Sequence, residues 1–193
     1  MSCWQCAEVV PFGGMRLRPY AEEDRWLTME LEGDPEVMRH LGGAAPDGRA
    51  DRVHEQRLNN DSMAWYRTIL DGPGDSPAGV VAVFHSTWDG RKIAELGIML
   101  RPGLGQRHGL GAGAVRLIIA EVRASNLVRE IHAFIGTENR AAAAVARRTG
   151  FVNTGPCDVD YEGVPMHSEH WLLDLTGTTP RPRNVRAPGP GPG

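Results

Sequence analysis

The chain of 193 residues has little of several features that define whole classes of proteins. Its three cysteines, Cys3, Cys6 and Cys157, are too few and too unevenly spaced for a disulfide framework. No apolar stretch approaches the length of about 20 residues that crosses a bilayer. The first 14 residues lack the basic and apolar regions of a secretion signal. These absences predict a cytoplasmic protein with reduced thiols and no membrane partner.

A surplus of positive charge is also missing. Lysine and arginine total 21 against 24 aspartates and glutamates, which gives a formal net charge of −3. Proteins that grip nucleic acid through its phosphates need a basic face, so we expect no nucleic-acid partner. The 41% of hydrophobic and 23% of charged residues are ordinary for a globular protein.

The length fits a single folded domain, which we place at residues 14–177. Residues 1–13 are a weakly specified N-terminal extension. Residues 178–193 are rich in proline, glycine and arginine with almost nothing apolar to bury, which predicts a disordered tail.

Within the domain, hydrophobic periodicity predicts an α+β order of elements. Strands are expected near residues 15–20, 64–70, 79–85, 93–100, 129–135, 151–161 and 167–175, and helices near 24–31, 34–43, 49–60, 109–124 and 139–149. Turn residues between the second, third and fourth strands indicate an antiparallel meander. The helix at 49–60 is polar and expected on the surface, whereas Trp26 and Trp65 are expected in the core.

The most informative segment is a glycine-rich stretch between a strand and a helix. Residues 100–114 read Leu-Arg-Pro-Gly-Leu-Gly-Gln-Arg-His-Gly-Leu-Gly-Ala-Gly-Ala. Free N–H groups at a helix N-terminus attract anions, and glycine lets a phosphate approach the backbone closely. The segment therefore predicts a diphosphate site built from main-chain N–H groups.

Two nucleotide motifs fit this segment poorly. A P-loop carries lysine and then serine or threonine after its last glycine, where this chain has Gly111 and Ala112. A dinucleotide fingerprint needs its third glycine one residue before Gly109. Binding of ATP or NAD is therefore the weaker interpretation.

Residues 106–111, Gln-Arg-His-Gly-Leu-Gly, resemble the Gln/Arg-x-x-Gly-x-Gly/Ala motif of the GNAT superfamily of N-acetyltransferases. Residues 139–151 resemble a later helix of that family, which opens with asparagine and ends in Gly-Phe. Both motifs stand in the family's order, and the resemblance covers residues 15–175, closest to the branch of ribosomal-protein N-terminal and small-amine acetyltransferases. It implies a mixed, mostly antiparallel central sheet flanked by helices on both faces.

The resemblance implies an acetyl-CoA-dependent N-acetyltransferase. Acetyl-CoA would be the co-substrate, and a primary amine, on a protein N-terminus or a small molecule, would attack its thioester directly in a ternary complex. No metal is needed, and the protein would be a monomer or a homodimer. The alternative is a non-catalytic domain that binds or senses acyl-CoA.

Cofactor binding is implied at three places. The strand before the glycine-rich loop would pair its main-chain groups with the pantetheine arm at Ile98, Met99 and Leu100. The pyrophosphate would lie on Gln106, Arg107, His108, Gly109, Leu110, Gly111 and Ala112. Asn139 would bond in the neighbourhood of the pantetheine, and it also has the residue type and position of a helix N-cap.

Glu95 is the candidate general base, because an alkyl ammonium of pKa about 10.4 must lose a proton before it attacks. On a strand, Glu95, Gly97 and Met99 share one face and Leu96, Ile98 and Leu100 the other. An anchor for the substrate ammonium and an exposed strand charge are the alternatives for Glu95.

A general acid for the leaving thiolate is harder to find. The positions that carry tyrosine or serine in many relatives are Ala146 and Ala142 here. A thiol of pKa about 8.5 leaves without help, so an acid is useful and dispensable. Tyr161 is the substitute candidate, with a packed strand aromatic as the alternative.

Three other signals are weak. Cys3 and Cys6 have the spacing of half a zinc site, but no second pair completes it. His167 and His170 would face opposite sides of a strand, so we expect no metal there. His132 lies within a strand and is expected to be packed rather than catalytic.

Overall fold

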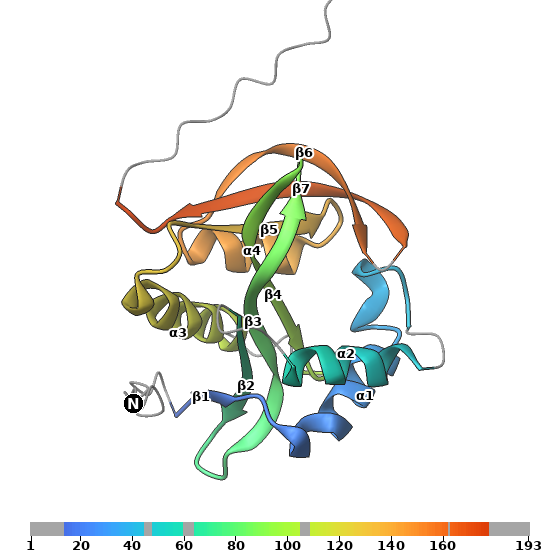
Figure 1. Cartoon of the computed structure of the whole chain (residues 1–193). Helices are drawn as coiled ribbons and strands as arrows, with labels where there is room; N and C mark the ends of the chain where they lie inside the picture. The colour runs from blue at the N-terminus through green and yellow to red at the C-terminus, as the bar shows by residue number, and fades with distance from the viewer. Residues whose placement is uncertain (1–13, 45–47, 60–63, 105–108, 162, 178–193) are drawn as a thin grey trace, which may run out of the picture.

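One seven-stranded sheet runs through the molecule in the order β1-β2-β3-β4-β5-β7-β6 (Figure 1). The computed structural model describes residues 14–44, 48–59, 64–104, 109–161 and 163–177. The strands are β1 (Arg16–Pro19), β2 (Trp65–Asp71), β3 (Ser76–Trp88), β4 (Arg91–Leu100), β5 (Glu130–Gly136), β6 (Val152–Tyr161) and β7 (Val164–Asp174). The helices are α1 (Arg25–Gly33), α2 (Arg49–Leu58), α3 (Leu110–Ser125) and α4 (Arg140–Arg148), with short 3-10 helices η1 (Glu22–Asp24) and η2 (Met38–His40).

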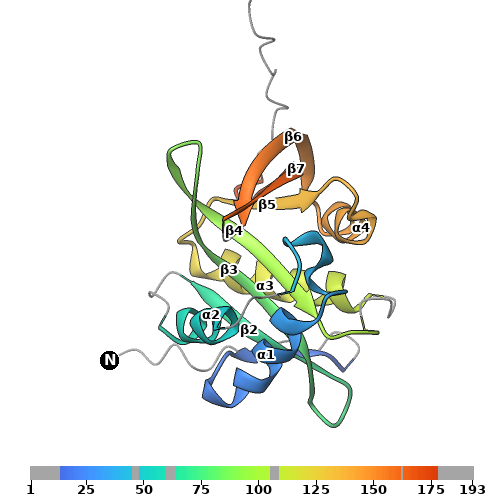
Figure 2. The same ribbon diagram turned by 90° about the vertical axis from the view of Figure 1, so that its right-hand side faces the viewer.

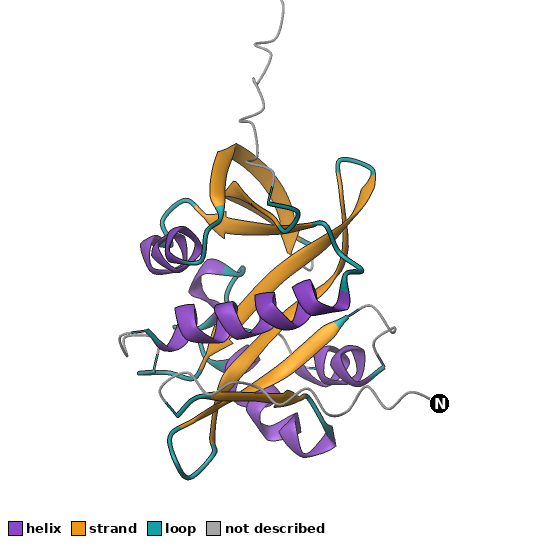
Figure 3. Ribbon diagram, turned by 90° about the vertical axis from the view of Figure 1, so that its left-hand side faces the viewer, coloured by secondary structure: helices purple, strands orange, loops and turns teal. Residues whose placement is uncertain are grey.

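Neighbouring strands are antiparallel except for β4 and β5, which run parallel. Helices cover both faces: α1 and α2 lie in front of the sheet in Figure 2, and α3 crosses the opposite face in Figure 3. This confirms the expected mixed, mostly antiparallel α+β fold. The predicted N-terminal extension and C-terminal tail, with Cys3 and Cys6, lie outside the described residues.

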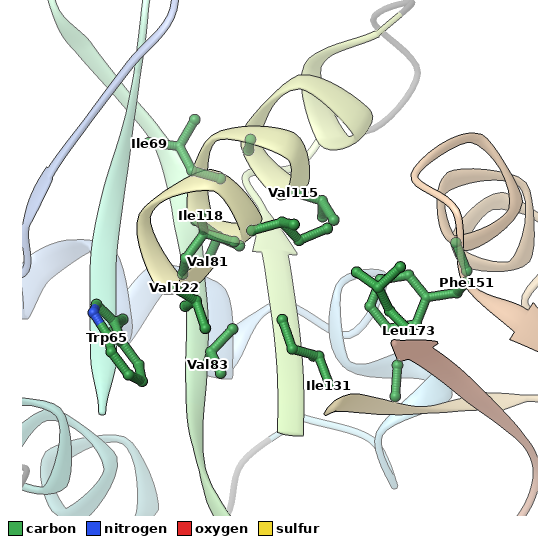
Figure 4. Close-up of a cluster of buried hydrophobic side chains, with 14 of the residues drawn as sticks. Trp65, Ile69, Val81, Val83, Val115, Ile118, Val122, Ile131, Phe151 and Leu173 are labelled. Atoms are coloured by element: carbon green, nitrogen blue, oxygen red, sulfur yellow. The ribbon is translucent and has the colours of Figure 1, made fainter. Parts of the chain in front are cut away.

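The larger core lies between the sheet and α3 (Figure 4). Val115, Ile118 and Val122 recur at helical spacing on α3, and all three are fully buried. They pack in one cluster with Val83 of β3 and Ile131 of β5. A smaller cluster on the opposite face is built from Tyr20, Leu27, Leu31 and Val80.

Two local expectations were wrong. The helix predicted at residues 34–43 is reduced to η2: residues 35–37 form turns, and Leu41, directly after η2, leaves helical geometry with φ of −128°. Trp65 is buried as expected, but Trp26 is 46% exposed. The Arg101 guanidinium carbon lies over the Trp26 ring, 5.2 Å from the centre of that ring. The i, i+4 pair Leu27 and Leu31 occupies the buried stripe of α1 instead.

Among the described residues, no helix combines the length and the apolar character that a bilayer crossing requires.

Candidate active site

The central feature of the site is a split between the two parallel strands. Strands β4 and β5 are paired at one position, Glu95 with His132. Beyond Glu95, the described residues 96–100 of β4 keep a register partner only on β3. Although β4 lies in the middle of the sheet, every residue from Glu95 to Leu100 is partly exposed. The edge of β4 that faces away from β3 is therefore open to an added extended chain.

The direction of the main chain decides which residues present polar groups at this edge. The Arg101 N–H donates to the Ala78 carbonyl on β3 at 2.9 Å. A Cβ on Gly79 would lie 2.2 Å from the Met99 carbonyl oxygen, so this oxygen also faces β3. Because main-chain groups alternate in direction along a strand, Ile98 and Leu100 present theirs to the open edge. Met99 differs from the expectation here, since its main chain faces β3.

Side-chain direction along β4 follows the predicted alternation. Leu96, Ile98 and Leu100 pack against the core under α3. Met99 packs on the opposite face against the cluster of Tyr20, Leu27, Leu31 and Val80.

The N-terminus of α3 lies next in the chain after this open edge. Gly109 is the N-cap with φ of +95°, and no described side chain caps the helix. The first intrahelical bond of α3 runs from the Gly113 N–H to the Gly109 carbonyl at 2.7 Å. The N–H groups of residues 110–112 precede it and belong to the uncapped first turn, where anions bind. The other three residues of the motif, Gln106, Arg107 and His108, lie outside the described residues.

The two motif glycines have different reasons to be glycine. Gly109 is exposed, and its positive φ suits a residue without a side chain. Gly111 is buried, and a Cβ there would lie 3.4 Å from Val145 Cγ2 and 3.7 Å from Leu100 Cδ1. Gly111 therefore lets α3 pack closely against α4 and β4, a role that the motif alone does not reveal.

Asn139 caps α4. Its Oδ1 accepts a hydrogen bond from the Ala142 N–H at 3.0 Å. The N-cap role is thus confirmed, and the side-chain NH₂ group keeps its donor capacity for another partner. Of the two alanines at positions where the family resemblance implies a proton donor, Ala146 is buried within the core and Ala142 packs at its margin.

Glu95 lies at the point where β4 and β5 part, on the face opposite α3. Burial raises the pKa of its carboxyl, and a hydrogen bond with Ser86 lowers it in part. Its register partner on β3 is Phe84, which stacks on Tyr66 at 6.0 Å between ring centres. A Cβ on Gly97 would lie 3.3 Å from Phe84 Cε1, so the small residue leaves room for this ring. The carboxyl therefore borders an aromatic surface, and its raised pKa suits a proton acceptor.

Tyr161 is the last residue of β6. It is half-buried, and the Arg49 guanidinium of α2 lies 5.8 Å from its ring centre. The β6–β7 hairpin also packs against the segment before α2, since a Cβ on Gly42 would lie 3.0 Å from Val164 Cβ. The tip of the hairpin reaches over η2 in Figure 1. Tyr161 is thus placed where the hairpin meets the first helices.

A buried ionic cluster beneath α1 and α2 was missed by sequence reasoning. Glu32 is fully buried, 3.1 Å from Arg57 Nη2 and 3.7 Å from Arg49 Nη2. Arg57 Nη2 also lies 3.5 Å from Met99 Sδ, which joins the cluster to β4. The prediction that residues 49–60 form a surface helix is therefore wrong for one face of α2, where Arg49, His54 and Arg57 are buried. The signal in the sequence is the i, i+4, i+8 spacing of Arg49, Val53 and Arg57, which puts them on one face of a helix.

Solved structures with a similar fold come from acetyltransferases. Spermidine N-acetyltransferase from Vibrio cholerae, solved with CoA and spermine, has a TM-score of 0.69 at 16% identity, covering 84% of this chain and 96% of its own. AAC(6')-Ib, solved with ribostamycin and coenzyme A, has a TM-score of 0.68 at 17% identity, covering 89% and 99%. A GNAT-family acetyltransferase from Bacillus anthracis has a TM-score of 0.67 at 13% identity, covering 84% and 95%. At these identities the likeness establishes the fold.

Comparison with curated protein sequences gave no match. The family described as "Acetyltransferase (GNAT) domain" matches residues 15–152, well over half of the chain. This agrees with the resemblance seen in the two motifs and with the mixed, mostly antiparallel sheet that it implied. The chain belongs to the GNAT family of acetyl-CoA-dependent N-acetyltransferases.

Proposed function

We propose that this protein transfers the acetyl group of acetyl-CoA to a primary amine, which attacks the thioester directly while both substrates are bound. The observation that carries the proposal is the open edge of β4 between an uncapped helix N-terminus and a carboxyl of raised pKa. In the reaction a C–N bond forms, the C–S bond breaks, and the ammonium proton must leave before attack.

The donor side of the site is proposed as follows. The main-chain groups of Ile98 and Leu100 hold the pantetheine arm as an added strand. The N–H groups of Gly109, Leu110, Gly111 and Ala112 bind the pyrophosphate, and Gln106, Arg107 and His108 complete this loop. Met99 anchors the strand through its side chain, and the Asn139 amide NH₂ donates to the pantetheine arm. Acetyl-CoA supplies the activated acyl group.

On the acceptor side, Glu95 removes the ammonium proton. The pKa of its carboxyl is raised toward neutral pH, and a general base works best when its pKa is near the pH of the reaction. The neutral amine then attacks the carbonyl carbon held at the split. Tyr161 is the proposed proton donor to the leaving sulfur. A thiolate can also leave without it.

The acceptor is proposed to be a small-molecule amine. The similar folds named above belong to proteins solved with spermine and with ribostamycin, both amine-bearing small molecules. The face beside Glu95 is bordered by Phe84 and Tyr66, and aromatic faces attract organic cations. A protein N-terminus is the second acceptor class. The protein is proposed to act in the cytoplasm, as a monomer or a homodimer.

The competing function is an acyl-CoA sensor without turnover, and the alanines at positions 142 and 146 favour it. The two functions are separated by measuring thiol release from acetyl-CoA with spermine, ribostamycin, amino acids and short peptides as acceptors. Turnover with any amine supports the enzyme. Calorimetric binding of coenzyme A without turnover on the whole panel supports the sensor, and no binding at all contradicts both.

A further inference from the structure

A row of polar side chains crosses the sheet beside Glu95. His132 of β5 and His170 of β7 are buried, and their Nδ1 and Nε2 atoms lie 2.9 Å apart. His170 Nδ1 lies 2.6 Å from the Thr154 hydroxyl of β6. The Trp88 ring packs on His170 at 4.1 Å between ring centres and covers the row. Three strands therefore contribute to one chain of hydrogen bonds.

The donor and the acceptor of each hydrogen bond in this row follow from the number of protons that each group carries. The Thr154 hydroxyl donates to the His170 carbonyl oxygen at 3.1 Å, so it accepts from His170 Nδ1–H. A neutral His170 then accepts at Nε2, and the donor there is His132 Nδ1–H. A neutral His132 thus carries its proton on Nδ1 and a lone pair on Nε2. This makes Nε2 of His132 a basic nitrogen, oriented through its other ring nitrogen.

His132 lies beside Glu95 on the neighbouring strand. The two residues are partners at the one bridge between β4 and β5. Both side chains lie on the face opposite α3, because Ile131 and Ala133 on either side of His132 are in the core under α3. Since Nδ1 of His132 faces β7, its Nε2 lies on the side of the ring away from β7.

A solvent-facing pocket begins at His132. It is lined by Trp88, Asp89, Arg91, Lys92, Ile93, Glu130 and His132. The Glu130 carboxylate, half-exposed, lies 3.7 Å from His132 Nε2 and stabilises a proton there. The charged and titratable groups around the ring, among the described residues, include Asp89, Arg91, Lys92, Glu95, Glu130 and His170.

We propose that His132 relays the acceptor's proton from Glu95 to solvent, and that His170 and Thr154 hold its ring in the tautomer that this step needs. The proton passes from the substrate ammonium to the Glu95 carboxylate, then to His132 Nε2, and leaves through the pocket beside Glu130. No other bond changes, and Glu95 is returned to its ionised form. This proposal rests on the proposed function and deepens it.

The test compares two acceptors that differ in basicity. The most active amine of the panel above is used together with an analogue whose amine is made weakly basic by neighbouring fluorine atoms. The weakly basic amine arrives neutral and needs no relay. We expect His132→Gln to lower kcat/KM for the basic amine by about 10-fold to 100-fold, within the range of proton-transfer contributions. The weakly basic amine should lose far less, and Thr154→Val should show a smaller effect in the same direction.

Phe134→Leu is the matched control, because Phe134 stacks on His170 at 5.3 Å without taking part in the hydrogen bonds. It should affect both amines equally. Equal losses for both amines in His132→Gln overturn the relay and leave the acetyltransferase function intact.

Nitrogen NMR of the histidine rings tests the proposal without any turnover. We expect neutral His132 to carry its proton on Nδ1, and this signal should change in His170→Asn. A neutral His132 protonated on Nε2 overturns the proposal. If the wild-type protein acetylates no amine, the proposed function fails, and the tautomer measurement still decides the hydrogen-bond geometry on which the relay depends.

Discussion

Replacing Gly79 by alanine should break the contact between β3 and β4 at the end where the edge of β4 is open. Gly79 is buried and pairs with Leu100. An added Cβ would lie 2.2 Å from the Met99 carbonyl oxygen and 3.0 Å from Leu100 Cα. Both neighbours are backbone atoms, so no rotamer change relieves the overlap. The end of β4 must move by at least roughly 1 Å to restore a normal contact.

The cost can be worked from the bonds that this movement breaks. On one side of Gly79 the Arg101 N–H donates to the Ala78 carbonyl at 2.9 Å, and on the other side Val80 pairs with Met99, whose main chain faces β3. Each buried main-chain bond that is lost costs about 1 kcal/mol, and more where a group is left unpaired. We therefore expect Gly79→Ala to lower the free energy of unfolding by about 2–4 kcal/mol, although alanine in a strand is otherwise favoured over glycine.

The assay is urea unfolding followed by circular dichroism, together with the KM for acetyl-CoA. The KM should rise, because Ile98 and Leu100 move with the end of β4. Gly33→Ala is the control: at the end of α1 an added Cβ meets no described atom within 4 Å, and stability should stay equal or rise. A Gly79→Ala protein as stable as the wild type would refute the reasoning about this edge.

Three further predictions concern titratable groups. Glu95→Gln should lower kcat/KM by about 10²–10⁴-fold, yet the variant should unfold at a higher urea concentration than the wild type at neutral pH. Burial raises the pKa of Glu95 in the folded protein. The stability that its protonated form contributes is therefore complete below the ordinary pKa of 4.5 and is lost as the pH rises through the raised pKa. The stability advantage should vanish in acid, and a constant difference at all pH values would contradict this account. Burial, with the charges of Asp158 and Glu169, raises the pKa of the Cys157 thiol to about 11, so iodoacetamide at pH 8 should alkylate it roughly 100-fold more slowly than a free thiol, measured by peptide mass spectrometry. Glu32→Gln leaves buried guanidinium groups without their carboxylate and should cost about 3–5 kcal/mol in urea unfolding, and a loss below about 1 kcal/mol would show that the cluster tolerates the change.

Much of the fold was predictable from local pattern. The i, i+3, i+4 spacing of apolar residues predicted α3, and the alternation along β4 correctly assigned Met99 and Leu100 to opposite faces. The glycine-rich loop and the Asn139 cap pointed to the family, because both features depend on residues adjacent in sequence. The family match and the α+β sheet confirmed that interpretation.

Other features depended on the tertiary structure, because they join residues that the chain pattern does not relate. The sequence did not indicate that Arg49 and Arg57 share the buried carboxylate of Glu32, or that Met99 turns its carbonyl toward Gly79. It predicted a packed His132 but not its bond to His170, 38 residues later. The sequence by itself determined most of the elements and the glycine-rich family motif, which follow from local periodicity and turn chemistry. The contacts across strands β4, β5 and β7 were decided only by folding, because register and strand order set which distant side chains meet.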